Sequence, residues 1–453
     1  MDAGTEGALI RTADKATPRN LLRQWVVRLL ALLVLPAQAQ SPEPLAAGLS
    51  CEPTRLELGM THAQFSLDGR GDQAAIAAAR QLVPHVGRYQ NLFIMGWGLL
   101  NPEPARGQYE WSTLDRRMSM IRETGGIPVV SLCCAPDWMK GGAQGQTDWR
   151  RLEVAPNRAH FADFAELARQ VALRYPDVRH YQVWNEFKGF WLAEQNRWDY
   201  EGYTELFNLV YRALKSVSPA IQVGGPYIVF QPWLHPPPEA DQAVLRGGYG
   251  VVDRRAMEAF DFWNTHKVGA DFIAVDGTIE ARDGAAADRL ASTRLFADVG
   301  EWLRQRSDLP IWWAEWYAAP WEAPQEQQNV LMAAALLRML PHASVALRWS
   351  PQGDAGRSPS GAQESLWTDT RLPGGGQPFS AAVTMMALRH CLPAGSCFRQ
   401  IGSAGNDVLG AIGANCSLLL NGSAYRREVQ LDGQVIDLPP WTVRTAYRPP
   451  PGP

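Results

Sequence analysis

Two glutamates each stand at the end of a short run of apolar and aromatic residues. Glu186 closes the stretch VWNE, and Glu315 lies in the stretch IWWAEW. Two carboxyl groups about 5–5.5 Å apart are the machinery of a retaining glycosidase, in which one attacks the sugar and the other acts as acid and then as base. The nucleophile has to stay ionised, whereas the acid needs surroundings that hold its proton. The chemistry therefore depends on whether the fold brings Glu186 and Glu315 to one sugar carbon.

Eight short apolar runs alternate with longer amphipathic stretches along the chain. We expect strands at 56–61, 91–97, 127–134, 180–186, 221–225, 271–276, 310–315 and 344–349. We expect helices between them, such as 161–173, 200–217, 285–306 and 325–340. Eight strand–helix units predict an α/β fold, a closed (β/α)8 TIM barrel whose chemistry lies at the C-terminal ends of its strands. Glu186 would end the fourth strand and Glu315 the seventh, so their side chains can converge over the barrel mouth.

An open, doubly wound sheet is the structural alternative to the barrel. It would more often have a Gly-rich phosphate turn after its first strand, and residues 59–62 (GMTH) form no such turn. After residue 392 the pattern changes to short strand-like segments at 407–413, 417–420, 428–431 and 442–447, separated by Asn-Gly and Asp-Gly turns. This part is predicted to form a small C-terminal all-β domain that borrows a strand from the segment just before residue 55. The predicted organisation is a catalytic barrel at 40–392, a sandwich-like β domain at 393–447 and a tail at 448–453.

Residues 1–39 have the pattern of a secretory signal peptide. Basic residues precede and interrupt an apolar run at 29–35, and the small residues Ala37 and Ala39 supply a cleavage site. The apolar run is too short to span a bilayer comfortably, because a spanning helix needs about 20 residues. We therefore expect a periplasmic or extracellular protein with no stable membrane span after cleavage. An uncleaved inner-membrane anchor is the alternative.

Charge and cysteine content narrow the partners of the chain. A formal net charge of −3 argues against a nucleic-acid partner, which would normally require a strong basic excess. Six cysteines in an exported chain permit disulfides, and Cys391 could pair with Cys397 while Cys416 pairs with Cys51. The adjacent cysteines at 133–134 are expected to be unpaired and buried in a strand. No CxxC pair or clustered His/Cys spacing indicates a metal site, and we expect no cofactor.

Besides the two glutamate stretches, residues 97–115 (WGLLNPEPARGQYEWSTLD) form a third motif, a Trp followed by Glu-Pro, Gly, Tyr, Trp and Leu-Asp. With these three stretches the chain resembles clan A glycoside hydrolases, and the resemblance is strongest to family 39. Residues 183–186 resemble its acid/base motif, and residues 314–316 resemble its nucleophile strand. The order and spacing cover residues 55–350, and the C-terminal β segment is also similar. The family includes β-xylosidases, α-L-iduronidases and enzymes of bacterial exopolysaccharide turnover.

The resemblance assigns roles to particular residues. It implies Glu186 as the acid/base, Glu315 as the nucleophile and Asn185 as a donor to the sugar 2-hydroxyl. Trp349, at the end of the eighth strand, is implied as an aromatic floor under the reacting sugar, with plain packing as the alternative. His62, after the first strand, is implied as a sugar-binding group, with capping of a turn as the alternative.

The sequence departs from the family at several strand ends. The sixth strand ends at Asp276, where relatives often present a His and a Tyr; Asp276 could bind a sugar hydroxyl or only cap the following helix. Phe187 replaces a Pro, and the second strand lacks the Arg that many relatives use to keep the nucleophile ionised, a task for which Arg348 could substitute. Trp138, after the third strand, could wall the cleft, and Trp97 could do the same. These departures leave the reaction type unchanged and the substrate open.

The function that these features predict is a cofactor-independent retaining O-glycoside hydrolase. Its partner would be an oligo- or polysaccharide, cleaved through a covalent glycosyl-enzyme. One rival is a catalytically inactive, carbohydrate-binding barrel associated with exopolysaccharide, which the missing Arg keeps open. Another is a transglycosylase that uses the same intermediate. The aromatic loop at 190–200 could form a subsite for further sugars or be ordinary packing.

Overall fold

The computed structural model describes residues 42–47, 51–320, 322–353 and 365–447. The predicted signal peptide at 1–39 and the predicted tail at 448–453 lie outside the described residues. Within the described ranges, no helix is both long enough and apolar enough to cross a membrane. The boundary predicted at residue 392 stays a prediction.

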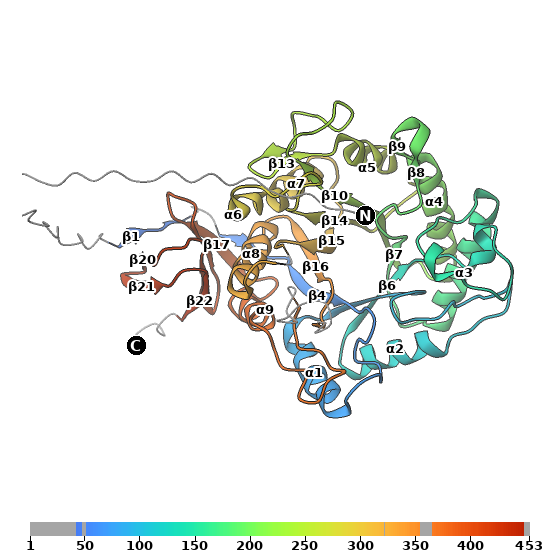
Figure 1. The fold of residues 1–453 in the computed structure, drawn as a ribbon, viewed down its shortest axis with the longest axis horizontal. Helices are drawn as coiled ribbons and strands as arrows, with labels where there is room; N and C mark the ends of the chain where they lie inside the picture. Colours follow the sequence, from blue (N-terminus) through green and yellow to red (C-terminus); the bar gives the residue numbers. More distant parts are fainter. Residues whose placement is uncertain (1–41, 48–50, 321, 354–364, 448–453) are drawn as a thin grey trace, which may run out of the picture. The chain divides into compact units, whose positions relative to one another are not determined.

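Eight parallel strands close into a barrel, which confirms the predicted (β/α)8 class (Figure 1). In chain order they are β4 (Glu57–Thr61), β5 (Tyr89–Phe93), β6 (Ile127–Leu132), β7 (His180–Val183), β10 (Gln222–Phe230), β14 (Phe272–Thr278), β15 (Ile311–Tyr317) and β16 (Ala343–Arg348). Each pairs with the next in the chain, and β16 returns to β4. The strands are almost wholly buried, because helices cover the outside and side chains fill the inside.

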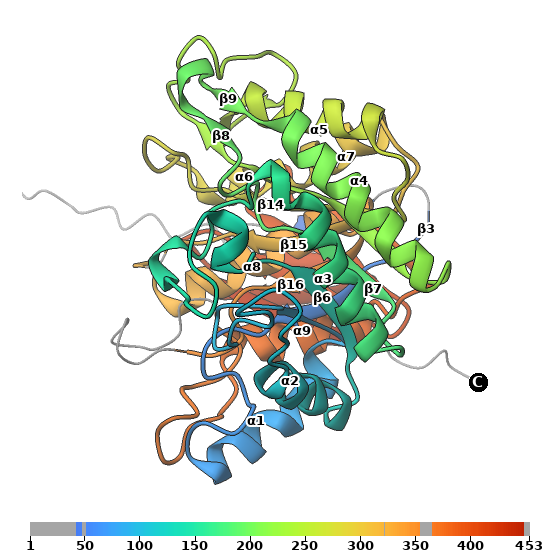
Figure 2. The same cartoon turned by 90° about the vertical axis from the view of Figure 1, so that its right-hand side faces the viewer.

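Helices follow the strands and cover the barrel. They are α1 (Gln73–Val86), α2 (Ser112–Glu123), α3 (Phe161–Arg174), α4 (Tyr200–Val217), α5 (Arg254–His266), α6 (Arg289–Ser292), α7 (Arg294–Arg304), α8 (Gln325–Met339) and α9 (Ser380–Cys391). In Figure 2, α3 and α4 lie side by side, with α5 packed next to α4. In α3, for example, Phe164, Leu167 and Val171 are buried at helical spacing and form an apolar stripe.

Several elements differ from the sequence-based prediction; the third and fourth barrel strands end at Leu132 and Val183, before residues 134 and 186, and the fifth continues to Phe230 instead of ending at residue 225. The second barrel strand ends at Phe93 instead of Trp97, because the chain turns at 96–98, where Gly96, Trp97 and Gly98 all have positive φ. The helix predicted over 285–306 is divided at Thr293, which ends α6 and precedes α7. The strand corrections lie at strand ends, where loop conformation rather than periodicity sets the boundary.

The C-terminal segment forms the predicted strands and two that the sequence pattern missed. Its strands are β17 (Cys397–Gly402), β18 (Val408–Ile412), β19 (Cys416–Asn421), β20 (Arg427–Leu431), β21 (Gln434–Leu438) and β22 (Thr442–Tyr447), of which β17 and β21 were not predicted. The N-terminal strands β1 (Glu43–Pro44), β2 (Ala46–Ala47) and β3 (Glu52–Pro53) pair with β20 or β17, so the borrowed strand is confirmed. In Figure 1 this part lies beside α8 and α9, which contact its strands.

The disulfides differ from the pairings expected. Cys51 bonds to Cys397, and Cys391 bonds to Cys416, with Cα–Cα distances of 5.5 and 4.6 Å. Pairing of β3 with β17 sets the first bridge, and contact of α9 with β19 sets the second, so tertiary contacts decided the partners. The expectation that the cysteines at 133–134 stay unpaired is also wrong, because they bond to each other directly after β6.

Candidate active site

The chain after β7 presents Glu186 to the barrel mouth. Trp184 and Phe187 on either side of it are fully buried: Trp184 Nε1 donates to the carbonyl oxygen of Lys188 at 2.7 Å, and Phe187 stacks on Tyr203 with ring centroids 4.0 Å apart. The side chain of Glu186 remains 15% exposed. Two aromatic anchors therefore fix this turn and leave its carboxylate at the edge of solvent.

The same turn holds an unusual backbone conformation. Trp184, Glu186 and Phe187 have φ values of +70°, +50° and +56°. Residues other than glycine seldom adopt positive φ, and each such conformation costs of the order of 1–3 kcal/mol. Such conformations cluster at functional sites and persist only where surrounding packing imposes them. The buried rings of Trp184 and Phe187 supply that packing.

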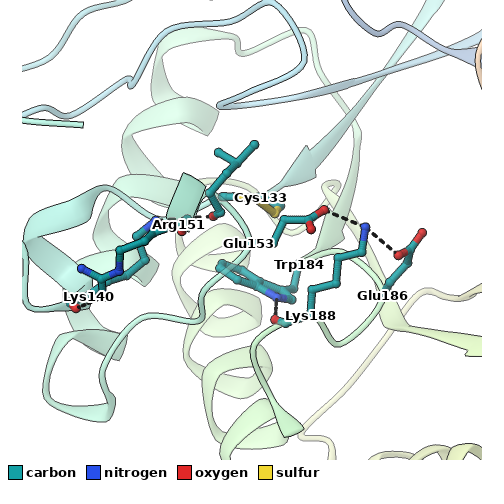
Figure 3. Close-up of a disulfide and its surroundings, with 9 residues drawn as sticks. Cys133, Lys140, Arg151, Glu153, Trp184, Glu186 and Lys188 are labelled. Carbon is teal, nitrogen blue, oxygen red and sulfur yellow. Dashed lines mark hydrogen bonds and ion pairs between the residues drawn. A yellow bond between two sulfur atoms is a disulfide. The ribbon is translucent and has the colours of Figure 1, made fainter. Parts of the chain in front are cut away.

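An ammonium group holds the carboxylate of Glu186. Lys188 Nζ lies 2.8 Å from Glu186 Oε2 and 2.6 Å from Glu153 Oε1, so it bridges the two carboxylates (Figure 3). In Figure 3 the Cys133 end of the adjacent-cysteine disulfide lies near this group. Burial lowers the pKa of Lys188, but the charges of Glu186 and Glu153 and the hydrogen bonds that they accept from the ammonium group together hold that pKa above its ordinary value. Lys188 therefore stays charged.

The second carboxylate stands on β15, next to a third on β14. Val275 of β14 pairs with Trp313, but the next residue, Asp276, pairs with Glu315, because β15 contains one additional residue at this point. The irregularity brings Asp276 and Glu315 side by side at the C-terminal ends of two neighbouring strands. Both are buried, with exposed fractions of 3% and 4%.

Two tyrosines donate hydrogen bonds to Glu315. The hydroxyl of Tyr227, on β10, donates to Oε2 at 3.1 Å, and the hydroxyl of Tyr317 donates to Oε1. Tyr317 follows Glu315 by two residues, and residues at that spacing lie on the same face of a strand. Burial raises the pKa of both tyrosines well above the ordinary value, so their hydroxyls stay protonated as donors. The carboxylate of Glu315 thus has both oxygens occupied by neutral donors.

One oxygen from each of Glu186, Asp276 and Glu315 lies within 4.8 Å of the others. Burial raises the pKa of Glu315 to about 8, and the charge of Glu186 acts in the same direction. Hydrogen bonding from Tyr317, the charge of Lys188 and hydrogen bonding from Tyr227 lower it. Carboxylates at this distance in a buried site cannot all ionise at neutral pH, so the group retains protons.

Asp276 is where one of those protons is held. Burial raises the pKa of Asp276 well above its ordinary value, and the charges of Glu315 and Glu186 add to this. Asp276 also forms a hydrogen bond with Glu186, which requires a proton between the two carboxyl groups. The three oxygens are close enough to ligate a cation, but Lys188 and the tyrosine hydroxyls already satisfy Glu186 and Glu315, so the arrangement needs none.

Two other predicted residues lie at the same mouth. Asn185 is buried, and its Oδ1 atom has no hydrogen-bond partner among the residues that the structure describes. An unpaired buried amide oxygen next to a carboxylate is suited to accept a hydrogen bond from a sugar hydroxyl, whereas the role expected for Asn185 was that of a donor. Trp349 is half-buried after β16, and its ring meets those of Phe93 and Trp97 at centroid distances of 5.9 and 6.0 Å.

Three further candidate side chains form hydrogen bonds with other groups of the protein. His62 is fully buried, with Nδ1 2.5 Å from the hydroxyl oxygen of Ser66 and Nε2 2.9 Å from Oε1 of Gln90. Trp138 is 6% exposed and donates through Nε1 to the carbonyl oxygen of Glu103 at 2.9 Å. These placements favour packing roles for both. Arg348 donates to the carbonyl oxygen of Trp316 at 2.5 Å and lies over the ring of Tyr317, so it supports a donor to Glu315.

Four residues of the site were missed by sequence reasoning. They are Glu153, Lys188, Tyr227 and Tyr317. The two-residue spacing of Glu315 and Tyr317 was a usable indication, since it places both on one face of a strand. Lys188 and Glu153 come from separate loops and meet only in the folded chain, so no local sequence pattern predicts their contact. Tyr227 has φ +57° on β10, a conformation that the sequence does not reveal.

The fold and the convergent carboxyl groups define a (β/α)8 barrel of the kind in which glycoside hydrolases place their chemistry. The family model described as Glycosyl hydrolases family 39 matches residues 100–347, more than half of the chain, and the chain belongs to that family. The resemblance inferred from the sequence is therefore confirmed. No curated protein matches the chain in sequence.

Solved structures share the fold at low sequence identity. A monomeric β-xylosidase from Caulobacter crescentus CB15 is 16% identical with a TM-score of 0.54, over 86% of this chain and 78% of the other. The GH39 enzyme from Xanthomonas axonopodis pv. citri is 18% identical with a TM-score of 0.56, over 88% and 78%. A conserved exported protein from Bacteroides fragilis is 11% identical with a TM-score of 0.63, over 89% and 100%.

Proposed function

We propose that the protein is a retaining O-glycoside hydrolase with Glu186 as acid/base and Glu315 as nucleophile. The observation that carries the proposal is the approach of their carboxyl oxygens to within 4.8 Å. Retaining enzymes hold the two groups about 5–5.5 Å apart, whereas inverting enzymes leave about 6.5–9.5 Å for a water molecule. The separation therefore favours a covalent mechanism over direct attack by water.

In the first step, a carboxylate oxygen of Glu315 attacks the anomeric carbon while Glu186 gives its proton to the glycosidic oxygen. The bond between the anomeric carbon and that oxygen breaks, and the leaving group departs as an alcohol. In the second step, Glu186 removes a proton from water, whose oxygen attacks the anomeric carbon and releases Glu315. Two inversions give net retention. Asn185 would bind the 2-hydroxyl, and Trp349 would lie under the reacting sugar.

The charges at the site suit this division of labour. Glu315 receives hydroxyl hydrogen bonds at both oxygens, which favour its ionised form against the burial that raises its pKa. Glu186 has a partly exposed side chain, so it can exchange protons with water between the two steps. Asp276, as a neutral acid hydrogen-bonded to Glu186, would orient the acid/base. This positioning role differs from both uses that the sequence left open, a sugar contact and a cap on the following helix.

A screen over aryl glycosides and bacterial polysaccharides tests the proposal. We expect release of sugar with the anomeric configuration of the substrate, followed by NMR during the first turnovers. A 2-deoxy-2-fluoro glycoside of the active sugar should accumulate as a covalent adduct, and peptide mass spectrometry should locate it on Glu315. Release of the opposite anomer, or an adduct elsewhere, would overturn the assignment. Products longer than the substrate would indicate transglycosylation by the same intermediate.

We also propose that the protein is exported. The signal-peptide pattern at 1–39 and a fold shared with a protein described as exported both support this. Fractionation of cells that express the full chain would test it. Cleaved protein is expected in the periplasm or the medium, and full-length protein in the cytoplasm would contradict export.

A further inference from the structure

A pocket of about 610 Å³ lies beside Glu186, outside the group of three carboxyls. It is formed by the loops that follow β5, β6 and β7. Four tryptophans line it, one from the β5 loop, one from the β6 loop and two from the β7 loop: Trp97, Trp149, Trp191 and Trp198. Its volume falls in the range of clefts that bind small organic ligands.

The pocket is continuous with the candidate active site on two sides. Lys188, which bridges Glu186 and Glu153, is part of its wall together with Glu153. Trp97, in the same wall, meets the ring of Trp349 with centroids 6.0 Å apart. A ligand that enters the pocket therefore lies directly next to a sugar held over Trp349 and Glu186.

The pocket is preformed by close packing of its loops. A Cβ atom on Gly189 would lie 2.3 Å from the backbone nitrogen of Ala155, and one on Gly96 would lie 2.5 Å from the side chain of Leu152. Both glycines have φ of +80°, which other residues seldom adopt. Trp191 is held by Trp198, at a centroid distance of 4.9 Å, and by the guanidinium of Arg255, which lies 5.1 Å from the ring centroid of Trp191.

The indoles in this pocket are unusually open to solvent. Trp149 is 46% exposed and Trp191 is 39% exposed, although burial of such rings is favourable by roughly 25 cal/mol per Å². Flat aromatic faces bordered by a few polar groups match a sugar ring, which has an apolar face and a rim of hydroxyls. Glu153 and Lys188 supply the polar groups at the pocket wall.

From this arrangement we propose that the pocket is a subsite for sugar units next to the one whose bond is cleaved. The substrate is then an oligosaccharide or polysaccharide rather than a simple glycoside. This inference rests on the proposed hydrolase function and deepens it. The aromatic loop at 190–200, for which sequence left a subsite and ordinary packing open, contributes to the subsite through Trp191 and Trp198.

Paired substrates separate the subsite from the reaction itself. The probes are xylo-, gluco- and manno-oligosaccharides from disaccharide to hexasaccharide, and the glycosyl fluoride of each monosaccharide. Fluoride is a single-atom leaving group, so it does not reach the pocket. For Trp191→Ala and Trp149→Ala, we expect kcat/KM on the active oligosaccharide to fall about tenfold or more. Turnover of the fluoride should stay within about twofold of the wild-type value, since neither tryptophan is one of the three carboxylates or their hydrogen-bonding partners.

Three controls make the outcome unambiguous. Tyr425→Ala removes a 71% exposed aromatic ring from the C-terminal part, and it should change neither kcat/KM on the oligosaccharide nor turnover of the fluoride. Trp191→Phe keeps an aromatic face and should lose less than Trp191→Ala. In the background of Glu315→Gln, calorimetry with the longest oligosaccharide should give weaker binding when Trp191 is replaced.

The two proposals fail in different ways. If the wild type hydrolyses the fluoride and the oligosaccharides, and both tryptophan variants hydrolyse the oligosaccharides normally, the subsite is wrong while the hydrolase stands. If the wild type hydrolyses the fluoride but no oligosaccharide, the subsite is also wrong. If the wild type hydrolyses no probe and the Glu315→Gln variant binds no oligosaccharide, both are overturned.

Discussion

Glu186 and Glu315 face each other across the barrel mouth in different surroundings. The β7 wall carries Glu186 on a loop, with a part-exposed side chain and a charged partner, Lys188. The β14–β15 wall carries Glu315 on a strand, buried and bonded to neutral hydroxyls. A group that must exchange protons with water needs access to solvent, which a loop position allows. A group that must form a covalent bond needs a fixed position from which water is excluded, which a buried strand provides.

The largest loss of activity is expected when either carboxylate is removed, and the two removals should differ. Glu315→Ala should lower kcat by about 10⁴-fold or more, because no group remains to form the intermediate. Glu186→Ala should still react with an activated aryl glycoside, since a good leaving group needs no acid. Added azide should then accelerate turnover and give a glycosyl azide of retained configuration, measured by NMR. Azide rescue of Glu315→Ala with retention instead would reverse the two roles.

The hydroxyl donors on the buried wall should have the next largest effect. Tyr317→Phe removes one hydrogen bond to the charged carboxylate, and kcat/KM should fall about 10–100-fold, since such bonds contribute about 1.5–3 kcal/mol. Tyr175→Phe is the matched control, because it removes a tyrosine hydrogen bond to Asp115 at 2.7 Å on the outer helices. If Tyr317→Phe and Tyr175→Phe behave alike, the donor is not needed.

The effect of Lys188 should be visible in the pH dependence of kcat/KM. Glu315 attacks as a carboxylate, and because its pKa is raised to about 8 it gains that charge only as the pH rises past this value, so the acidic limb of kcat/KM should lie near pH 8. The charge of Lys188 lowers the pKa of Glu315, so Lys188→Met should move the acidic limb to higher pH.

Lys215→Met is the control for the lysine substitution. Lys215 pairs with Asp271 at 2.8 Å, at the opposite end of the barrel from the three carboxylates of the candidate site. Its replacement should leave the pH profile unchanged. A shift of the acidic limb to lower pH in Lys188→Met, or no shift, would contradict this action of the lysine on Glu315.

The smallest change should come from Asp276→Asn. Because Asp276 is held neutral, an uncharged isostere that can still donate to Glu186 should change kcat/KM less than about threefold over the pH range. Asp276→Ala loses the hydrogen bond and should be worse than the Asn variant. A large loss with Asn, equal to that with Ala, would show that Asp276 works as a carboxylate.

Periodicity was enough to predict the barrel and the wall positions of both glutamates. Alternating apolar and amphipathic runs gave all eight strands, and the C-terminal ends of the fourth and seventh placed Glu186 and Glu315 at one mouth. Strand ends were less accurate, as at Phe93, because turn conformation sets them. His62 illustrates the limit for single residues. Its place after the first strand was foreseen, but Ser66 and Gln90 occupy both its ring nitrogens inside the protein.

By itself the sequence determined which residue types end which strands, since side-chain pattern and strand period are local properties. Only the tertiary structure decided what surrounds them. Lys188 meets Glu153 from another loop, Asp276 meets Glu315 through a register shift, and Cys391 meets Cys416 through helix–strand packing. Each of these contacts depends on distances between segments far apart in the chain, and proton positions follow from the resulting burial and charge.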